Sequence, residues 1–176
     1  EGARDCAVEF FSLSKTFNMT GWRIAYAVGN RDAIAALARL KTFLDNGLFL
    51  ALQAAGAATL RAWERFVPGN VAVFRERRDA AVEAFRAAGF DVAVPRATIY
   101  LWMRIPTGEP SQAFCRRILE ETGVVLFPGA AMGTGGEGFV RVALTVSPDR
   151  LREAAARVGA VLAGTGQATG SKTNAR

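Results

Sequence analysis

The hydrophobic and polar positions change period several times along the chain, and each change predicts a new element. Residues 8–13 and 22–29 are apolar and aromatic runs, which predict two buried strands. Apolar residues then recur at helical spacing over 34–44, and a second helical stretch runs over about 50–62. Asn46-Gly47 separates these two stretches, so the first part of the chain is predicted to hold two strands followed by two helices.

The remaining residues predict a small α+β domain. A turn at Pro68-Gly69-Asn70 marks the expected domain boundary, and an amphipathic helix follows it to Ala88, where Gly89 ends it. Residues 164–176 lack large apolar side chains, so we expect a disordered tail. Between them we expect strands over 91–94, 98–105, 124–127 and 139–146, a helix over 111–121 with Ser111 as its N-cap, and a helix over 148–163.

Composition narrows the classes of protein that fit. Hydrophobic residues make up 51% and charged residues 22% of the chain, which supplies enough apolar surface for a packed core. No apolar run reaches the roughly 18 residues of a membrane span. The net charge of +6 is not gathered into a basic stripe with stacking aromatics, so we expect neither a membrane nor a nucleic-acid partner. Cys6 and Cys115 are too few for a disulfide framework and indicate a reducing compartment.

Histidine is absent from the sequence, and this removes several catalytic arrangements. No Ser-His-Asp or Cys-His arrangement and no histidine zinc site can form, and we expect no metal. Proton transfer near neutral pH then has to use a lysine, a carboxylate, a tyrosine or a cysteine with a shifted pKa.

Lys15 is the first candidate for such chemistry. It lies between the two predicted strands, where burial would lower the pKa of its amine. A neutral amine can form a Schiff base, which a guanidinium cannot. Ser12, Ser14 and Arg23 lie in the same segment, and hydroxyls with a forked guanidinium suit a phosphate. The alternative is a structural loop with a salt-bridged arginine and a lysine stem lying along apolar surface.

Arg141 is the second candidate, because it lies in the apolar strand predicted over 139–146. A buried charge is costly unless it is paired, and a carboxylate that accepts two hydrogen bonds would satisfy it. The structural interpretation is an ion pair with Glu137 or Glu120.

Two neighbouring features are expected to be structural. The loop over 129–138 is rich in glycine but lacks the Gly-Lys-Ser/Thr ending of a P-loop, so we interpret it as a mobile connection. Tyr100 and Trp102 alternate with Leu101 in a predicted strand, and we expect both rings to pack in the core.

The lysine segment resembles a known motif. Residues 12–23 read SLSKTFNMTGWR and are similar to the lysine attachment motif of class I pyridoxal-phosphate aminotransferases, with Gly21-x-Arg23 at the family's spacing. The residues of this motif are most similar to those of the branch of LL-diaminopimelate, N-succinyldiaminopimelate, aspartate and alanine aminotransferases. The similarity continues to about Gly164.

This resemblance implies an α/β fold, namely the C-terminal portion of a fold type I pyridoxal-phosphate-dependent transferase. Residues 1–67 would be the C-terminal end of the large cofactor-binding domain, 68–163 the small α+β domain with its linking helix, and 164–176 a disordered tail. The family's chain is much longer, so we expect a fragment. The other part would supply the aspartate that pairs with the pyridine nitrogen and the ring that stacks on the cofactor.

The resemblance also assigns roles to the candidate residues. Lys15 would bind pyridoxal phosphate covalently and shuttle a proton between substrate and cofactor. Ser12 and Arg23 would hold the cofactor phosphate, with Ser14 a weaker candidate. Arg141 would bind the α-carboxylate of the substrate instead of forming an ion pair, and the loop over 129–138 could move as the small domain closes.

The implied function is transfer of an amino group from an amino acid to a 2-oxo acid, with a diaminopimelate-type, aspartate or alanine donor, in a cytoplasmic homodimer of amino-acid and lysine biosynthesis. The alternatives are a carbon–sulfur lyase or an acyl-CoA condensing enzyme on the same scaffold, or a standalone interaction domain without catalysis. The isolated chain should be almost inactive and should expose an aggregation-prone edge near Ser12 and Trp22. The portion over about 70–163 could fold alone.

Overall fold

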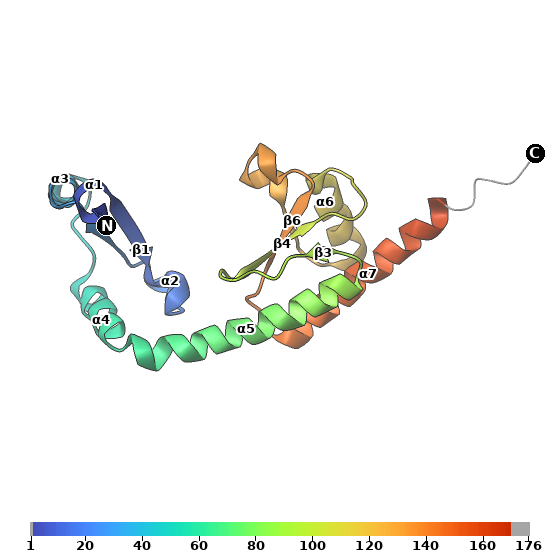
Figure 1. Cartoon of the computed structure of the whole chain (residues 1–176), viewed down its shortest axis with the longest axis horizontal. Coiled ribbons are helices and arrows are strands. Elements are labelled where there is room, and N and C mark those ends of the chain that lie inside the picture. The colour runs from blue at the N-terminus through green and yellow to red at the C-terminus, as the bar shows by residue number, and fades with distance from the viewer. Residues whose placement is uncertain (1, 170–176) are drawn as a thin grey trace, which may run out of the picture. The chain divides into compact units, whose positions relative to one another are not determined.

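The computed structural model describes residues 2–169, which form two compact units: unit 1 up to Ala72, and unit 2 from Val73 onward. Helices and strands are mixed in both units (Figure 1), which confirms the predicted α/β class. Within residues 2–169, no helix is both long enough and apolar enough to cross a membrane.

Unit 1 is built on a two-stranded antiparallel sheet. Strands β1 and β2 pair so that Val8 lies opposite Gly29 and Ser12 opposite Ala25. The two strands are therefore confirmed, but their predicted burial is wrong, since most of their residues are exposed. The second strand also begins later than predicted, at Ala25, because the residues predicted to start it form a 3-10 turn. The elements of unit 1 are α1 (Ala3–Cys6), β1 (Val8–Ser12), α2 (Leu13–Thr16), η1 (Thr20–Trp22), β2 (Ala25–Gly29), α3 (Arg31–Leu44) and α4 (Leu50–Arg61).

The core of unit 1 is small. Its buried members are Leu13, Met19 and Ile24, which lie in or next to the turn that joins the two strands. Helix α4 reaches this core through Gly56, where an added Cβ would lie only 2.5 Å from Cδ1 of Ile24. The glycine therefore allows the helix to approach the turn closely.

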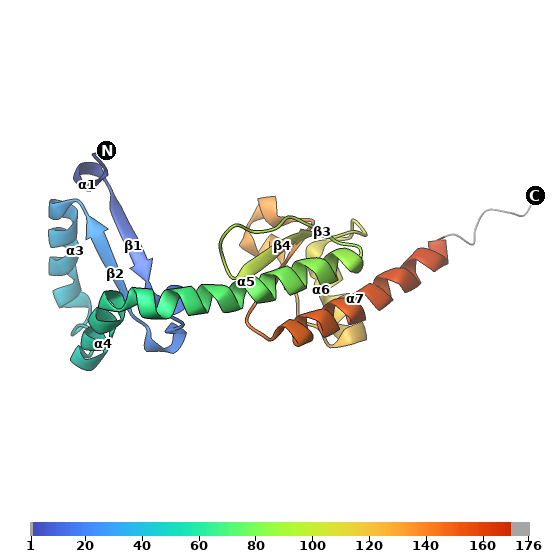
Figure 2. The ribbon, with the colours of Figure 1, turned by 60° about the horizontal axis from the view of Figure 1, so that its bottom comes forward.

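Helix α5 (Trp63–Ala87) is continuous, and the turn expected at Pro68-Gly69-Asn70 is wrong (Figure 2). A proline inside a helix removes one hydrogen bond and costs about 3 kcal/mol. The helix tolerates it because its C-terminal half buries a face that ends at Phe85, and such tertiary packing outweighs local propensity. Gly89 follows the helix with φ of 92°, so the predicted C-terminal end is confirmed. The domain boundary between residues 67 and 68 stays a prediction.

Unit 2 contains a four-stranded antiparallel sheet in the order β3-β4-β6-β5, covered on one face by helices. The alternation along β4 and β6 buries Leu101, Met103, Val140 and Val142 against that layer. The core includes residues of α5, α6 and α7, so three helices contribute to it. The elements that follow α5 are β3 (Asp91–Val92), β4 (Tyr100–Arg104), α6 (Ser111–Thr122), β5 (Phe127–Pro128), η2 (Gly129–Met132), η3 (Thr134–Gly136), β6 (Phe139–Ala143) and α7 (Pro148–Thr169).

Three boundaries in unit 2 differ from the predicted ones. Ser111 is the first residue of α6 and not its N-cap, because the carboxylate of Glu137 accepts the hydrogen bond from its backbone N–H at 2.6 Å. The strand predicted over 124–127 begins only at Phe127. Helix α7 continues to Thr169, so the tail expected over 164–176 is wrong up to that residue. Residues 170–176 lie outside the described residues.

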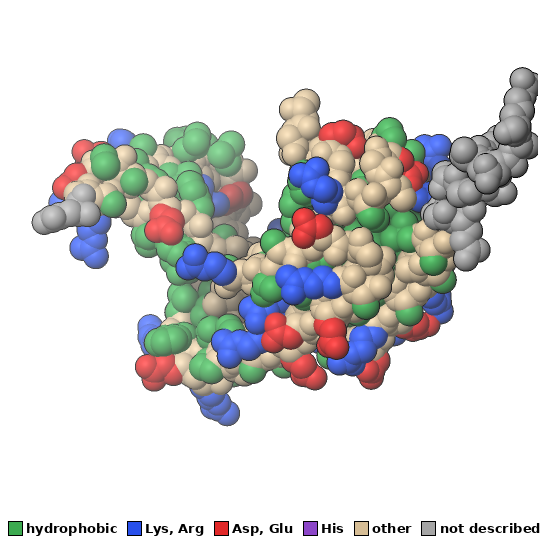
Figure 3. Space-filling model, turned by 45° about the vertical axis from the view of Figure 1, so that its right-hand side comes forward, with side chains coloured by type: hydrophobic (Ala, Val, Ile, Leu, Met, Phe, Trp, Pro, Cys, Tyr) green, Lys and Arg blue, Asp and Glu red, His purple; other side chains and the backbone are tan. Residues whose placement is uncertain are grey.

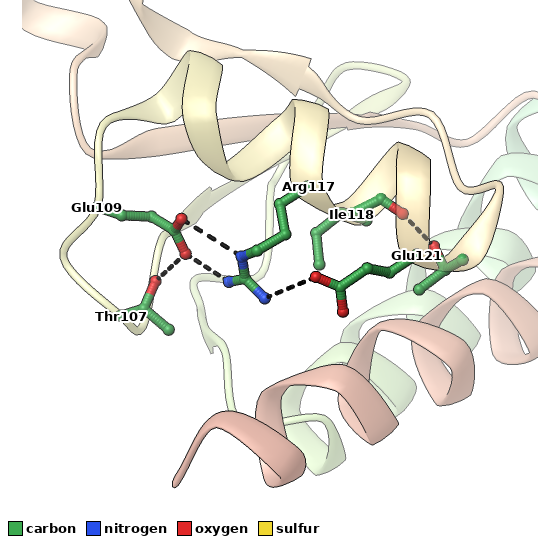
Figure 4. A network of polar contacts seen from close by, with 6 residues as sticks. Thr107, Glu109, Arg117, Ile118 and Glu121 are labelled. Carbon is green, nitrogen blue, oxygen red and sulfur yellow. Dashed lines mark hydrogen bonds and ion pairs between the residues drawn. The ribbon is translucent and has the colours of Figure 1, made fainter. Parts of the chain in front are cut away.

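A polar network ties the loop before α6 to the helix surface (Figure 4). Arg117 donates hydrogen bonds to Glu109 and lies 4.0 Å from the carboxylate of Glu121. Thr107 donates to the same Glu109 carboxylate at 2.8 Å. The hydrogen bond from Arg117 lowers the pKa of Glu109, so this carboxylate stays ionised.

Candidate functional site

The turn that carries Lys15 follows β1 directly. Ser12 is the N-cap of α2, and its Oγ accepts a hydrogen bond from the backbone N–H of Ser14 at 3.1 Å. Leu13 and Ser14 are buried, whereas Lys15 is exposed. The predicted burial of Lys15 is wrong for this chain, because its side chain is exposed although the residues just before it are buried. Its amine forms no ion pair or hydrogen bond within residues 2–169.

The segment after Lys15 is held by side-chain contacts to the backbone. Thr20 Oγ1 donates to the carbonyl of Ser14 at 3.1 Å, and Arg23 Nη1 donates to the carbonyl of Thr20 at 2.9 Å. Arg23 has φ of 51° and Asn18 has φ of 56°, a left-handed conformation that non-glycine residues adopt at a cost of about 1 kcal/mol or more. Arg23 therefore caps the 3-10 turn, and the expectation that it begins the second strand is wrong.

Asn70 of α5 closes the same turn from the opposite end. Its Nδ2 donates to the carbonyl of Lys15 at 3.1 Å and to the carbonyl of Thr16 at 3.0 Å. The backbone of Lys15 is thus held between the Ser12 cap and the Asn70 amide. The fold brings Ser12, Lys15 and Arg23 into one turn of unit 1, in which neither Lys15 nor Arg23 has a carboxylate partner among the described residues.

Arg141 belongs to unit 2 and lies between two aromatic rings. In the sheet it is paired with Trp102 of β4 and Phe127 of β5. Its guanidinium carbon lies 4.3 Å from the ring centre of Tyr100 and 4.5 Å from that of Phe127. Such cation–π contacts stabilise a cation without neutralising it. The two rings hold the guanidinium, and its charge stays available.

The structural alternative for Arg141, an ion pair with Glu137 or Glu120, is absent from the described part of the chain. The Glu137 carboxylate binds the backbone N–H groups of Ser111 and Gly138, and Glu120 forms no ion pair within residues 2–169. Besides the two ring contacts, the Arg141 side chain makes one weak polar contact within residues 2–169, of 4.0 Å to Sδ of Met132. The guanidinium edge is left without an anion.

Tyr100 and Trp102 lie on the sheet face opposite the core, so the expected core packing is wrong. Trp102 is 39% exposed and stacks on Phe139 with ring centres 5.5 Å apart, and Arg104 lies over the same Phe139 ring. The core takes Leu101 and Met103 instead. The alternation predicts two faces, but both carry large apolar or aromatic side chains, so Tyr100 and Trp102 alone do not show which face the helices cover.

Comparison with known proteins identifies the family. Residues 3–158 match the family described as aminotransferase class I and II. The chain belongs to this family. The resemblance predicted from the lysine motif is confirmed.

The relatives found for this aminotransferase chain are longer proteins. It is 48% identical over 157 residues to an LL-diaminopimelate aminotransferase of Nitratidesulfovibrio vulgaris, which covers 89% of this chain and 40% of that relative. The same enzyme of Natranaerobius thermophilus is 46% identical over 157 residues, covering 89% and 41% of the two chains. The structure of a probable N-succinyldiaminopimelate aminotransferase from Thermus thermophilus superposes with a TM-score of 0.85 at 39% identity, covering 91% of this chain and 43% of that one. The chain therefore spans less than half the length of these relatives.

The glycine-rich loop of this aminotransferase chain is a packed structure of two 3-10 turns. Gly129 and Gly136 are buried against each other: a Cβ on Gly129 would lie 2.0 Å from the carbonyl oxygen of Gly136. Ser111 Oγ accepts from the backbone N–H of Ala130 at 3.2 Å and donates to Glu137. The bond from Ser111 N–H, followed by that from Gly138 N–H, lowers the pKa of Glu137. The loop that precedes Arg141 is thereby fixed to the start of α6.

The cysteines offer no second site. Both are free, Cys6 exposed and Cys115 in the core of unit 2. Burial raises the pKa of the Cys115 thiol to about 11, which keeps it protonated and unreactive near neutral pH. Over the described residues, His, Cys, Asp and Glu side chains form no group of three or more that could hold a metal.

Sequence reasoning does not find two parts of this arrangement. The local pattern places Asn70 in a turn, and its target lies 55 residues away, a distance over which periodicity carries no signal. The pattern predicts Phe127 only as a strand residue. Its position opposite Arg141 depends on the register between β5 and β6, which the sequence alone leaves open.

Proposed function

We propose that this chain contributes the lysine and carboxylate-binding segments of an aminotransferase that uses pyridoxal phosphate. The observation that carries the proposal is the turn at Lys15, which presents an amine without a partner while its backbone is held by three side chains. A fixed backbone with a free reactive group is the arrangement expected of a covalent attachment point. A purely structural lysine would be expected to use its amine in an ion pair or a hydrogen bond.

The groups in the turn fit pyridoxal phosphate chemically. The Lys15 amine is the group that an aldehyde requires, and the Ser12 hydroxyl and the Arg23 guanidinium are donors suited to a phosphate. Arg23 uses one of its N–H groups for the carbonyl of Thr20 and keeps others for a ligand. When bound, the cofactor supplies an electron sink for the substrate Cα.

Each of the four candidate site residues then has a distinct role. Lys15 Nζ would hold the cofactor, and the same amine would accept and return the proton at the substrate Cα. Ser12 and Arg23 orient the phosphate. Arg141 binds the substrate α-carboxylate with both arms of its fork, while the rings of Tyr100 and Phe127 keep the guanidinium plane in place.

The finer assignments follow the relatives. A diaminopimelate-type donor is proposed from the names of the relatives that are 46–48% identical, with aspartate and alanine as further donors and a 2-oxo acid as acceptor. We also propose a cytoplasmic homodimer, with residues 1–67 in the large domain and 68–163 in the small domain.

Incubation of the natural full-length protein and pyridoxal phosphate with a panel of amino donors and 2-oxo acids tests the function. Stoichiometric transfer of the amino group, with diaminopimelate among the best donors, is the expected result. Release of ammonia and pyruvate without amino transfer would establish a carbon–sulfur lyase. Strict preference for phenylalanine, tyrosine or histidinol phosphate would refute the donor assignment.

A further inference from the structure

The amide of Asn70 is the long-range contact that closes the Lys15 turn. Both carbonyls it binds, those of Lys15 and Thr16, are at the C-terminal end of α2. The last carbonyls of a helix lack the usual partner within the helix. The Lys15 carbonyl also accepts a longer bond of 3.4 Å from the backbone N–H of Asn18. The Thr16 carbonyl accepts its hydrogen bond from the Asn70 amide, the donor found for it among residues 2–169.

Helix α2 depends on such partners because it is very short. It contains 4 residues, and isolated helices below about 12 residues are marginal in water. The Ser12 hydroxyl accepts from a backbone N–H at the start of α2, and the Asn70 amide donates to a carbonyl at its end. One amide group has two donor hydrogens, so Asn70 can serve both carbonyls at once.

The position of Asn70 within α5 points the same way. Asparagine is a poor residue in a helix interior, because its side chain competes for backbone hydrogen bonds. Asn70 does not bind the backbone of its own helix but the backbone of a segment 54 and 55 residues earlier. Its side chain joins the helix that continues into unit 2 to the turn of the reactive lysine.

We infer that Asn70 is a positioning residue for Lys15, an inference that rests on the proposed role of Lys15 as the cofactor attachment point. The amine is at the end of a flexible four-carbon stem, so the direction in which it reaches depends on the orientation of the Lys15 backbone. The Asn70 amide holds that backbone through hydrogen bonds to the carbonyls of Lys15 and Thr16. A displacement of about 1 Å at a reacting group can cost on the order of 100-fold in rate.

Asn70→Asp and Asn70→Ala in the natural full-length protein loaded with pyridoxal phosphate test the inference. Aspartate has the same shape but no donor hydrogen, and alanine removes the donor without adding charge. Asn46→Asp is the matched control, because Asn46 is exposed and forms no hydrogen bond in the described chain. The readouts are the pH midpoint of the visible absorbance of the lysine-bound cofactor, kcat and KM for the amino donor, and the melting temperature.

Both Asn70 variants should move the pH midpoint of the absorbance and lower kcat by about 10- to 100-fold with less effect on KM, and the control should do neither. An unchanged midpoint and kcat in both Asn70 variants would overturn the inference, as would a change in melting temperature alone. A change seen only with aspartate would assign the effect to the new charge and overturn it too. Wild-type protein that binds no pyridoxal phosphate on Lys15 would instead refute the proposed function, so the two failures are distinguishable.

Discussion

Units 1 and 2 contain similar numbers of aromatic residues but place them differently. In unit 2, Phe85 and Phe114 are fully buried in a core shared by the sheet and three helices. In unit 1, Phe10, Phe43 and Phe49 are 70%, 88% and 72% exposed. Figure 3 shows hydrophobic side chains on the surface of the molecule, and unit 1 supplies many of the largest.

This difference separates the part of the chain that completes its own core from the part that does not. An exposed apolar surface of this kind marks a face made for contact with other protein, and β1 and β2 also leave strand edges open. The proposed cofactor lysine lies in unit 1, which does not complete its own core, whereas Arg141 lies in unit 2, which does. Folding of unit 2 therefore should not require the rest of the family's fold, and folding of unit 1 should.

The largest expected effect comes from separating the units. Residues 73–169 alone should give a cooperative thermal transition as a monomer, because their core is complete. Residues 2–72 alone should show no cooperative transition and should associate as concentration rises. Circular dichroism melting and sedimentation measure both properties. A monomeric, cooperatively melting unit 1 would contradict the comparison.

Single core truncations should sharpen the contrast. Phe114→Ala in unit 2 should lower the free energy of unfolding by about 3–5 kcal/mol, since it removes a fully buried ring. Phe43→Ala in unit 1 is the matched change at an exposed ring and should change the free energy of unfolding by less than about 0.5 kcal/mol. Denaturant titration of the whole chain, followed by signals from each unit, provides the values. Equal losses at the two positions would show that unit 1 has a comparable core.

Substitution of the two arginines on the open face of the unit 2 sheet should separate binding from packing. Arg141→Lys keeps the charge but loses the fork, and it should raise KM for the amino donor by about 100-fold in the natural full-length enzyme. Arg104→Lys is the control, since Arg104 also lies over an aromatic ring, that of Phe139. It should leave KM near the wild-type value. Similar KM values for the two variants would argue against a carboxylate role for Arg141.

The smallest expected effect is the pH dependence of unit 2 stability through Glu137. Its pKa in the folded state lies below the ordinary value of about 4.3, because it accepts bonds from Ser111 and Gly138. The stabilisation is therefore fully present above that ordinary pKa and is lost as the pH falls through the lower folded pKa. Glu137→Gln should flatten the acid limb of stability against pH, and Glu120→Gln should leave it unchanged. An acid limb that Glu137→Gln does not alter would remove this anchor of the loop.

The sequence alone predicts most of the elements, because strands over 8–13 and 139–146 and the helical spacing over 34–44 are strong local patterns. It also singles out Lys15 and Arg141, whose residue types are unusual in their settings. It does not predict the continuity of α5 through Pro68, which depends on tertiary packing, or the exposure of Lys15. The contacts of Asn70 and Phe127 depend on register and on helix placement, and neither leaves a mark in local sequence.

Reduction of the natural full-length protein with borohydride in the presence of pyridoxal phosphate, followed by peptide mapping, tests the central claim most directly. The pyridoxyl group is expected on Lys15. Among the lysines within residues 2–169, it is the one in a turn that side chains hold at both ends. Lys15→Arg, which keeps the charge, should abolish the label. A pyridoxyl group on Lys41 or Lys172, or elsewhere, with Lys15 unmodified, would contradict the assignment of Lys15 and with it the roles of Ser12 and Arg23.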